Sequence, residues 1–590
     1  MANKSPEGIN KPMKVSAKDG SAEKSETAFV DLPAPTESFG FQRDRLGVVL
    51  CILVCELCER LTYYSIAGNL VLYCTNSLKF SSADATTISL IFTGTSYFLP
   101  VLGGWIADTV SGKFNAILGA ALIYCIGTTL LPLISIDYTK YGPHLGLSTG
   151  QQRGFFLFGI AIIAVGTGGI KSNVGPFGAQ QLDDKGEGAV KTFFNWFYWF
   201  INVGSAVAFS AVVYVQQEIG FDVGFAIPAC ALVVAIIMLL IGRKWYRMRP
   251  PEGSVFTTVA KIIWEAIIRG RKPGARKDKR TSWLDSAKQS FGGHFPDVKV
   301  NEVKSLGRIL PVFAVIIFYW TVYNQMSTTY LLQGERMRIV YNNFTIPVAA
   351  INLFDIVIIL VLIPFVDRVF YPFMAKLGYP LSSLRRIGIG MVLAVLSMVI
   401  AAGIEFARKA NIEEYGYFKQ ELANKAFNAS ELSIFAQIPQ YTLIGASEVF
   451  TSITGLEFAY SQSPKAMQGV VMGLFLLTSG LGSYIGSLLV VVVNAITSED
   501  EWIPDEINYG HLEYFFFLLA VIMTINFVCF LLIARGYVYV KDAELILLPE
   551  TDDESSRRSS LAGGNRRNNQ KDTTPLLMND DVAPTSFTIN

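Results

Sequence analysis

The chain has 590 residues and a formal net charge of +1; 51% of its residues are hydrophobic, 13% aromatic and only 16% charged. This composition is too apolar for two or three ordinary water-soluble domains, so it indicates a protein embedded in a lipid bilayer. No nucleic-acid partner is expected.

The chain opens on residues 1–45, which are rich in Lys, Ser, Glu and Pro and lack an early apolar core, so no secretory signal peptide is expected. Six apolar stretches follow, each with the roughly 20 residues that a helix needs to cross the hydrocarbon core. They lie near 47–74, 84–108, 114–136, 154–177, 192–215 and 222–242, and together they predict an N-terminal half over 46–242.

A polar linker is predicted over 243–305. Residues 243–304 contain fifteen Lys and Arg against six Asp and Glu, which favours the cytoplasmic side. The basic run 269–280 has two interpretations, an anionic-lipid contact or a solvated cluster that sets topology, and the second is favoured. An amphipathic surface helix is predicted because apolar residues recur at helical spacing opposite Lys261 and Glu265: Val255, Val259, Ile262, Ile263 and Ala266.

Six more apolar stretches lie near 307–332, 345–368, 384–405, 431–457, 467–494 and 512–535, predicting a C-terminal half over 306–536. The polar residues 537–590 are expected to form a disordered tail. The fold class is therefore an all-α membrane protein with twelve transmembrane helices, whose two six-helix halves move around a central site. Twelve crossings put both termini in the cytoplasm.

Short signals lie outside these spans. Asn343 and Asn428 begin glycosylation sequons in loops that are predicted to be non-cytoplasmic, so a glycoprotein is expected. In the C-terminal tail, Asp572 with Leu576 and Leu577 resembles the acidic dileucine signals that adaptor complexes read in sorting to endosomes and lysosomes.

Charged residues interrupt several spans, although each costs about 2.5 to 3.5 kcal/mol at the centre of a bilayer helix. Counting the helical rise from the predicted cytoplasmic ends places charges from both halves, together with the polar Asn202, in one layer near mid-membrane. Transporters that are built from two helical halves bind their substrate at this depth. The charged residues of this layer are Glu56, Glu59, Arg60, Lys171, Asp355 and Glu448.

Glu56, Glu59 and Arg60 share one helical face. Two neighbouring carboxylates cannot both ionise cheaply while Arg60 favours ionisation, so the group is suited to taking up and releasing a proton. The alternative is a fixed Glu–Arg contact between helices.

Lys171 suits a substrate carboxylate and Glu448 a substrate ammonium, so together they predict a site for a zwitterion. Alternatively, Lys171 pairs only with a protein carboxylate. The run Gly166–Gly169 before Lys171 predicts close approach of a partner helix. Aromatic side chains with polar tips supply candidate walls: Tyr63, Tyr64, Tyr97, Trp320, Tyr330 and Phe450.

These residues occur in segments with a family resemblance. Residues 56–60 (ELCER) resemble the E-x-x-E-R motif of the proton-coupled oligopeptide transporters of the major facilitator superfamily. Residues 103–108 with Gly112 and Lys113 resemble the superfamily's loop motif between helices two and three. Residues 193–205 are similar to the fifth-helix signature, and residues 439–467 to the tenth helix.

This resemblance implies residue roles. Proton coupling falls to Glu56, Glu59 and Arg60, and gating to Asp108 and Lys113. Substrate binding falls to Tyr64, Tyr97, Lys171, Asn202, Trp320, Gln325, Asp355, Glu448 and Phe450. Protons are the coupling ion, and no cofactor or metal is expected. An enzyme is not expected, because the three histidines lie in predicted loops without metal-ligand spacing.

Departures from the family pattern favour one branch. Ala67 stands where many peptide carriers have Arg, Leu90 where animal relatives have His, and Asn324 precedes Gln325 where an acid is common. With Asp355, these differences resemble the peptide and histidine transporter branch, which implies an endosomal or lysosomal membrane, with the plasma membrane as the alternative. Asp355 is hypothesised to replace the missing acid as a partner of Lys171.

The expected function is symport of protons with histidine and small peptides, out of an acidic lumen or into the cell, by alternating access. Two alternatives stay open. One is a transporter-like sensor or scaffold that recruits signalling partners, and the other is a carrier of nitrate or another non-peptide solute on the same fold.

Overall fold

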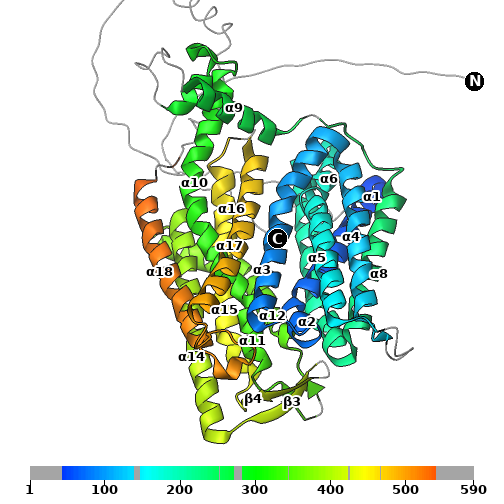
Figure 1. The fold of residues 1–590 in the computed structure, drawn as a ribbon. Helices are drawn as coiled ribbons and strands as arrows, with labels where there is room; N and C mark the ends of the chain where they lie inside the picture. Colours follow the sequence, from blue (N-terminus) through cyan, green and yellow to red (C-terminus); the bar gives the residue numbers. More distant parts are fainter. Residues whose placement is uncertain are drawn as a thin grey trace, which may run out of the picture.

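The computed structural model describes residues 43–138, 146–251, 253–270, 282–342, 344–422, 425–464, 467–537 and 539. Most of the two predicted tails, residues 271–280 of the basic run, Asn343 and the sorting signal at Asp572, Leu576 and Leu577 therefore lie outside the described residues. Helices make up most of the described chain, in two bundles that stand beside each other (Figure 1).

The first bundle is built from residues before 243. Its helices are α1 (Arg43–Ala67), α2 (Leu70–Asn76), α3 (Ser82–Ile106), α4 (Lys113–Ser135), α5 (Thr149–Lys171), α6 (Val174–Gln180), α7 (Glu187–Val207) and α8 (Phe221–Gly242). Three π-helical turns interrupt or extend them: η1 (Ala107–Ser111), η4 (Ala208–Val212) and η5 (Val215–Ile219).

The second bundle follows helix α9 (Val255–Gly270) of the linker. Its main helices are α10 (Asp297–Tyr323), α11 (Thr329–Glu335), α12 (Asn352–Phe365), α13 (Tyr371–Lys376), α14 (Ser383–Tyr415), α15 (Ile438–Glu448), α16 (Thr454–Ser461), α17 (Gln468–Ile496) and α18 (Leu512–Gly536). Short turns join the broken helices: η8 (Asn324–Ser327), η9 (Val348–Ile351), η10 (Val366–Phe370) and η12 (Val449–Ile453).

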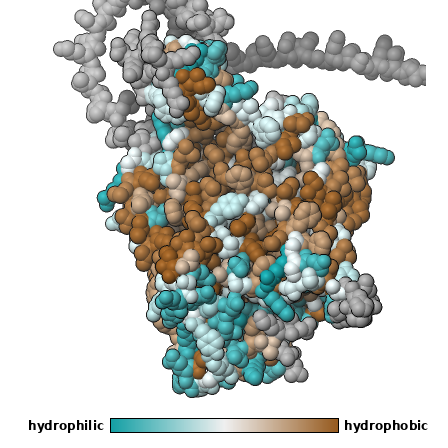
Figure 2. Space-filling model, viewed as in Figure 1, coloured by the Kyte–Doolittle hydropathy of each residue, from teal (hydrophilic) through white to brown (hydrophobic). Residues whose placement is uncertain are grey.

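Ten helical segments of the described chain are long and apolar enough to cross a bilayer. The α1–α2 and α15–α16 segments complete the twelve crossings of a multi-pass membrane protein. These two are less apolar or less continuous, because α1 carries three charges in its centre and α15 is separated from α16 by η12. Figure 2 shows apolar residues across the middle of the visible face, with the largest group of polar residues at the lower end.

Two short antiparallel hairpins lie outside the spans, an addition to the predicted all-α fold. Strand β1 (Val340–Tyr341) pairs with β2 (Phe344–Thr345), and β3 (Phe418–Leu422) pairs with β4 (Lys425–Ala429). In Figure 1, β3 and β4 mark one end of the molecule and α9 the other. We call these the hairpin end and the linker end.

Two helices extend beyond the predicted spans. Helix α10 begins at Asp297 rather than near 307, and α14 continues to Tyr415 rather than ending near 405. Hydropathy detects the hydrocarbon-crossing part of a helix, whereas polar turns that continue it into water carry no such signal.

Glycines allow the close helix approach that the sequence predicted for α5. A Cβ on Gly168 would lie 2.5 Å from Leu99 Cβ of α3, and a Cβ on Gly103 of α3 would lie 2.6 Å from the Gly168 carbonyl oxygen. Only glycine fits at such a distance. This contact fixes α5, and with it Lys171, against α3.

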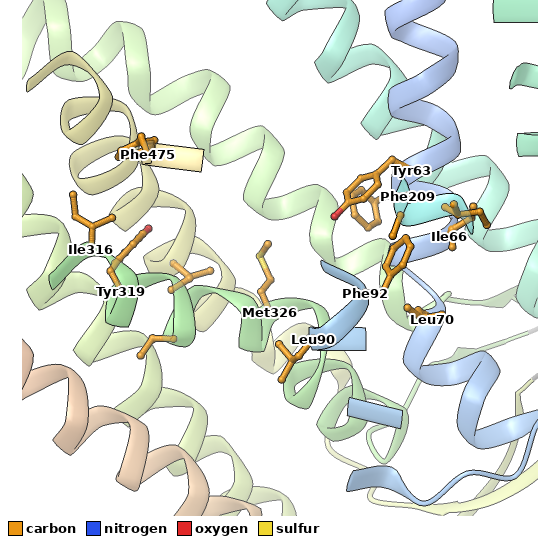
Figure 3. Close-up of a cluster of buried hydrophobic side chains, with 14 of the residues drawn as sticks. Tyr63, Ile66, Leu70, Leu90, Phe92, Phe209, Ile316, Tyr319, Met326 and Phe475 are labelled. Carbon is orange, nitrogen blue, oxygen red and sulfur yellow. The ribbon is translucent and has the colours of Figure 1, made fainter. Parts of the chain in front are cut away.

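The two bundles meet at the hairpin end. Asn76 of α2 donates a hydrogen bond to Glu335 of α11 at 3.0 Å, and the Val348 amide donates to Gln217 Oε1 of η5 at 3.1 Å. Figure 3 shows buried apolar side chains of both bundles, with Leu90 of α3 near Met326 of η8 between them. Leu90 is 1% exposed and lies against α17, because a Cβ on Gly486 would be 3.5 Å from Leu90 Cδ1, so it packs between the halves.

Candidate substrate and proton site

A buried ion-pair cluster lies on α1. Arg60 Nε is 3.1 Å from Glu56 Oε1, and the Arg60 guanidinium also pairs with Glu59. Glu56 is 3% exposed, Glu59 0% and Arg60 5%. The shared helical face predicted from the sequence is therefore present, and one guanidinium serves both carboxylates.

Lys171 ends α5 beside this cluster. Its ammonium lies 3.6 Å from the centre of the Tyr97 ring and 4.2 Å from that of Tyr63. Lys171 Nζ has no hydrogen-bond partner among the described residues, although Glu56, Glu59 and Arg60 are within electrostatic range. The structure thus presents a cation held by aromatic faces rather than by a carboxylate.

A second cluster, which contains only acidic charged groups, lies in the C-terminal bundle. Tyr323 of α10 donates a 2.6 Å hydrogen bond to Glu448 Oε2 at the end of α15. Asp355 of α12 is 4% exposed and within electrostatic range of Glu448. A Cβ on Gly445 would lie 2.6 Å from Asp355 Oδ1, so the absence of a side chain there makes room for the carboxylate.

The two clusters face each other. The electrostatic neighbours of Tyr64 and Tyr97 include Glu448 as well as Arg60 and Glu59, although the tyrosines and Glu448 belong to different bundles. Tyr198 of α7 is likewise within electrostatic range of both Glu448 and Asp355. The α1 cluster, in which Arg60 and Lys171 accompany Glu56 and Glu59, therefore lies within electrostatic range of the same tyrosines as the carboxylate of Glu448.

Asp355 is placed differently from the hypothesis that made it a partner of Lys171. In this conformation it lies with Glu448, and the charged neighbours of Lys171 all come from α1. Asp355 and Glu448 are thus grouped together and away from the lysine.

Two predicted site residues border the same region. Asn202 of α7 is half-buried and donates to the Tyr198 carbonyl at 2.8 Å, and Trp320 of α10 packs edge-on to Tyr323 at 5.1 Å between ring centres. Trp320 Nε1 is buried without a hydrogen-bond partner among the described residues.

Gln325 and Phe450 are not brought to this region by their contacts. Gln325 is fully buried, donates a hydrogen bond to the Thr321 carbonyl and accepts one from the Thr329 hydroxyl. These bonds satisfy buried polar groups where the chain breaks between α10 and α11. The Phe450 ring instead contacts those of Phe370 and Tyr371, next to η10. The contacts of both side chains lie within the C-terminal bundle in this conformation.

The predicted gating residues lie at the linker end. Asp108, in η1, accepts a 2.9 Å backbone hydrogen bond from Gly253 and is within electrostatic range of Lys113, the first residue of α4. The neighbouring Trp105 donates to Thr257 of α9 at 2.8 Å. The loop motif is therefore joined to the linker.

Of the two predicted glycosylation sites, Asn428 lies in β4 at the hairpin end, half-buried, while Ser430 of the same sequon is fully buried.

A cavity of about 430 Å³ opens at the hairpin end of the first bundle, lined by residues such as Tyr73, Gln216 and Asp222. None of the predicted substrate or proton residues lines it.

Sequence reasoning did not select two residues of the site. Tyr323 is not among the predicted site residues, and Tyr198 belongs only to the fifth-helix signature at residues 193–205. Tyr323 nevertheless donates a hydrogen bond to Glu448, and Tyr198 is within electrostatic range of it. A signal for Tyr323 existed, because it stands three residues after Trp320 and therefore shares its helical face.

A family model described as the POT family matches residues 114–507, which is well over half of the chain. The chain belongs to the POT family. Among curated relatives, Protein NRT1/PTR FAMILY 8.5 of Arabidopsis thaliana is 36% identical over 533 residues, covering 82% of this chain and 88% of that protein. Solute carrier family 15 member 3 of Rattus norvegicus is 32% identical over 542 residues, covering 85% and 93%.

A crystal structure of an auto-inhibited POT family peptide transporter matches with a TM-score of 0.70 at 26% identity, over 84% of this chain and 98% of that one. POT family members are proton-coupled peptide transporters with the major facilitator fold, so this chain is a transporter and not an enzyme. Protons are the coupling ion, and no cofactor is required.

Proposed function

We propose that this POT family member couples protons to the movement of histidine and di- or tripeptides, out of an acidic lumen or into the cell. The observation that carries the proposal is the charge separation of the site. The Lys171 ammonium is buried and has no hydrogen-bond or ion-pair partner among the described residues, whereas Glu448 and Asp355 lie together in the other half. A zwitterion matches this arrangement, with its carboxylate toward Lys171 and its ammonium toward Glu448.

Binding of a zwitterion would offset most of the cost of keeping these charges in the bilayer. An unpaired ion at this depth is unfavourable, and a ligand of complementary charge removes that penalty on both sides at once. Aromatic walls of Tyr64, Tyr97 and Trp320 add surfaces that tolerate side chains of different shape, as a carrier of several peptides requires.

The transport cycle we propose begins with the site open to the acidic side. Protonation of Glu56 or Glu59 weakens the contact with Arg60, substrate settles between Lys171 and Glu448, and the halves rock. Release of the proton at cytosolic pH re-forms the ion pairs and expels substrate. Each pH unit supplies about 1.4 kcal/mol per proton, which corresponds to tenfold accumulation.

We further propose a lysosomal or endosomal membrane, with both termini in the cytoplasm and sorting adaptors reading Asp572, Leu576 and Leu577. The basic linker supports this orientation through the positive-inside rule. It would put the hairpin end, with Asn428 of β4, in the lumen. Cell-surface biotinylation before and after Leu576→Ala and Leu577→Ala would test the signal, because loss of sorting should increase the surface fraction.

Uptake by proteoliposomes tests the function. Labelled histidine or dipeptide should accumulate under an inward proton gradient and should not do so when the gradient is collapsed. Lys171→Gln should reduce uptake at least about tenfold, because a charged hydrogen bond is worth roughly 1.5 to 3 kcal/mol. Lys376→Gln, an exposed lysine of α13, is the matched control and should retain uptake.

The same assay separates the alternatives. Binding of histidine or peptide without flux would support a sensor, and competition by nitrate but not by dipeptides, histidine or muramyl-type peptides would support a non-peptide carrier. The two carboxylates Asp355 and Glu448 disfavour a substrate that is only an anion. Asp355→Asn should change proton-driven uptake and its pH profile, and an unchanged profile would exclude a coupling role for Asp355.

A further inference from the structure

The four charged groups around α1 have a net charge of zero, but their ion pairs are not evenly shared. Glu56 and Glu59 contribute two negative charges, and Arg60 and Lys171 contribute two positive charges. Arg60 nevertheless pairs with both carboxylates, at 3.1 Å from Nε to Glu56 Oε1 and by direct contact with Glu59. Lys171 is therefore left without an ion pair in this conformation, although the acids are within electrostatic range.

Two tyrosine faces take the place of that ion pair. The Lys171 ammonium lies 3.6 Å from the Tyr97 ring centre and 4.2 Å from the Tyr63 ring centre, well within the roughly 6 Å of a cation–π contact. The two rings are 6.5 Å apart and nearly perpendicular, at 88°, so the cation meets both faces at once. Nζ has no hydrogen-bond partner among the described residues.

The Tyr63 and Tyr97 rings, which we call the lysine cradle, are held by packing. Tyr63 is 3% exposed, stacks on Phe92 of α3 with a 21° interplanar angle, and meets Tyr64 edge-on. Figure 3 shows Tyr63 beside Phe92 and Phe209 in the first bundle. One ring of the cradle comes from α1 and the other from α3, so it exists only where these helices meet α5.

We propose that Tyr63 and Tyr97 are positioning residues that hold the Lys171 ammonium away from Glu56 and Glu59 while the site is empty. When the substrate carboxylate binds Lys171, the ammonium moves away from the two ring faces. Lys171 therefore breaks no ion pair of its own when it binds the substrate carboxylate. This inference rests on the proposed function, in which Lys171 binds the substrate carboxylate.

The cradle predicts different results for ring-retaining and ring-removing variants. Tyr63→Phe and Tyr97→Phe keep the ring faces, so each should lose less affinity for a dipeptide than a variant that lacks both rings. The double variant Tyr63→Leu with Tyr97→Leu removes both faces, so Lys171 should move to the α1 carboxylates. We expect its KM for a dipeptide to rise about tenfold or more, with a larger effect on KM than on kcat and an altered pH profile.

Phe92→Leu is the matched control for lost aromatic packing, because this ring stacks on Tyr63 and has no contact with the ammonium. It should behave like the Phe variants. An equal rise in KM for Phe92→Leu and for the double Leu variant would overturn the cradle. A Phe variant whose KM rises as much as that of the double Leu variant would also overturn it, because the hydroxyl would then be the important group.

A structure of the ligand-free double Leu variant provides a readout that does not depend on transport. With the cradle removed, Lys171 Nζ should lie within ion-pair distance of Glu56 or Glu59, whereas an unmoved Lys171 would overturn the inference. If the wild-type protein carries no peptide or histidine, the proposed function fails, and this structural result still shows whether the cradle holds the lysine.

Discussion

At the scale of single residues, the site solves the problem of placing several charges in a bilayer. Taking an ion pair out of water costs several kcal/mol per ion and is repaid only by close contacts. Arg60 makes such contacts with both Glu56 and Glu59. A proton on either acid removes one of these contacts, so protonation directly changes how firmly Arg60 is held.

Glu59→Gln should therefore separate proton coupling from binding. The variant mimics a permanently protonated Glu59, so we expect proton-driven accumulation to fall at least about tenfold while exchange of labelled for unlabelled substrate continues. Parallel measurements of driven uptake and counterflow in proteoliposomes check this. Glu413→Gln, at an exposed position on α14, is the control, and driven uptake by Glu59→Gln at the wild-type level would contradict the role.

Tyr323 orients the carboxylate that is proposed to receive the substrate amino group. Its hydroxyl donates to Glu448 at 2.6 Å, and hydrogen bonds to charged groups contribute about 1.5 to 3 kcal/mol. Tyr323→Phe should raise the KM for a dipeptide about tenfold, with little effect on a peptide whose amino end is acetylated.

The neighbouring Tyr319→Phe is the matched control for this prediction. Tyr319 is bonded to Ser447 at 3.1 Å rather than to Glu448, so its loss should leave the KM within about twofold. Similar KM values for Tyr323→Phe and Tyr319→Phe would show that the hydroxyl does not set the affinity of Glu448.

The charged layer was predictable from the sequence, whereas its pairings were not. Glu56, Glu59, Lys171 and Glu448 stand out because each is costly in an apolar span. Which partner each side chain meets depends on helix rotation and tilt, and these are set by packing against other helices. For this reason Asp355 was matched with Lys171 in the sequence prediction but lies with Glu448 in the structure.

At the scale of helices, glycine contacts bring the functional side chains together. Helix α5 crosses α3 so closely that a Cβ on Gly103 would overlap the Gly168 carbonyl oxygen at 2.6 Å. Lys171 lies three residues after Gly168 on α5, and Tyr97 lies six residues before Gly103 on α3, so this contact brings both side chains close together. The glycine run of α5 was recognised in the sequence, but its partner helix could not be identified from one sequence.

Gly103→Ala should therefore destabilise the protein by about 1 to 3 kcal/mol, because backbone atoms on the opposite helix cannot give way. Its neighbour Gly104 is the matched control, since a Cβ there would be 3.7 Å from Ser172 and makes an ordinary contact. Melting of the purified variants in detergent measures the difference. Equal melting temperatures for Gly103→Ala and Gly104→Ala would contradict the close α3–α5 crossing.

At the scale of the whole molecule, the twelve-helix arrangement was predictable because apolar spans report crossings directly. The hairpins β1–β2 and β3–β4 were not predicted, since they lie in polar loops where hydropathy is uninformative. The contacts between the halves depend on conformation and have no signature in a single sequence. They include the hydrogen bond from Asn76 to Glu335 at the hairpin end.

Alternating access requires this end to separate, because substrate can enter from the hairpin end only if the halves part there. Asn76→Cys with Glu335→Cys, joined by a short thiol-reactive cross-linker, should hold the end closed. We expect uptake to fall at least about tenfold, while substrate still binds from the linker end, and a reducible cross-linker should restore uptake on reduction.

The matched control joins two positions within one half. Tyr73 and Ser135 are hydrogen-bonded at 2.8 Å inside the first bundle, so cross-linking Tyr73→Cys to Ser135→Cys should leave rocking of the halves intact. Because the two pairs carry the same reagent and the same number of new cysteines, a difference in uptake between them isolates the movement between halves. Full uptake by the cross-linked Asn76–Glu335 pair would mean that the hairpin end does not open during transport.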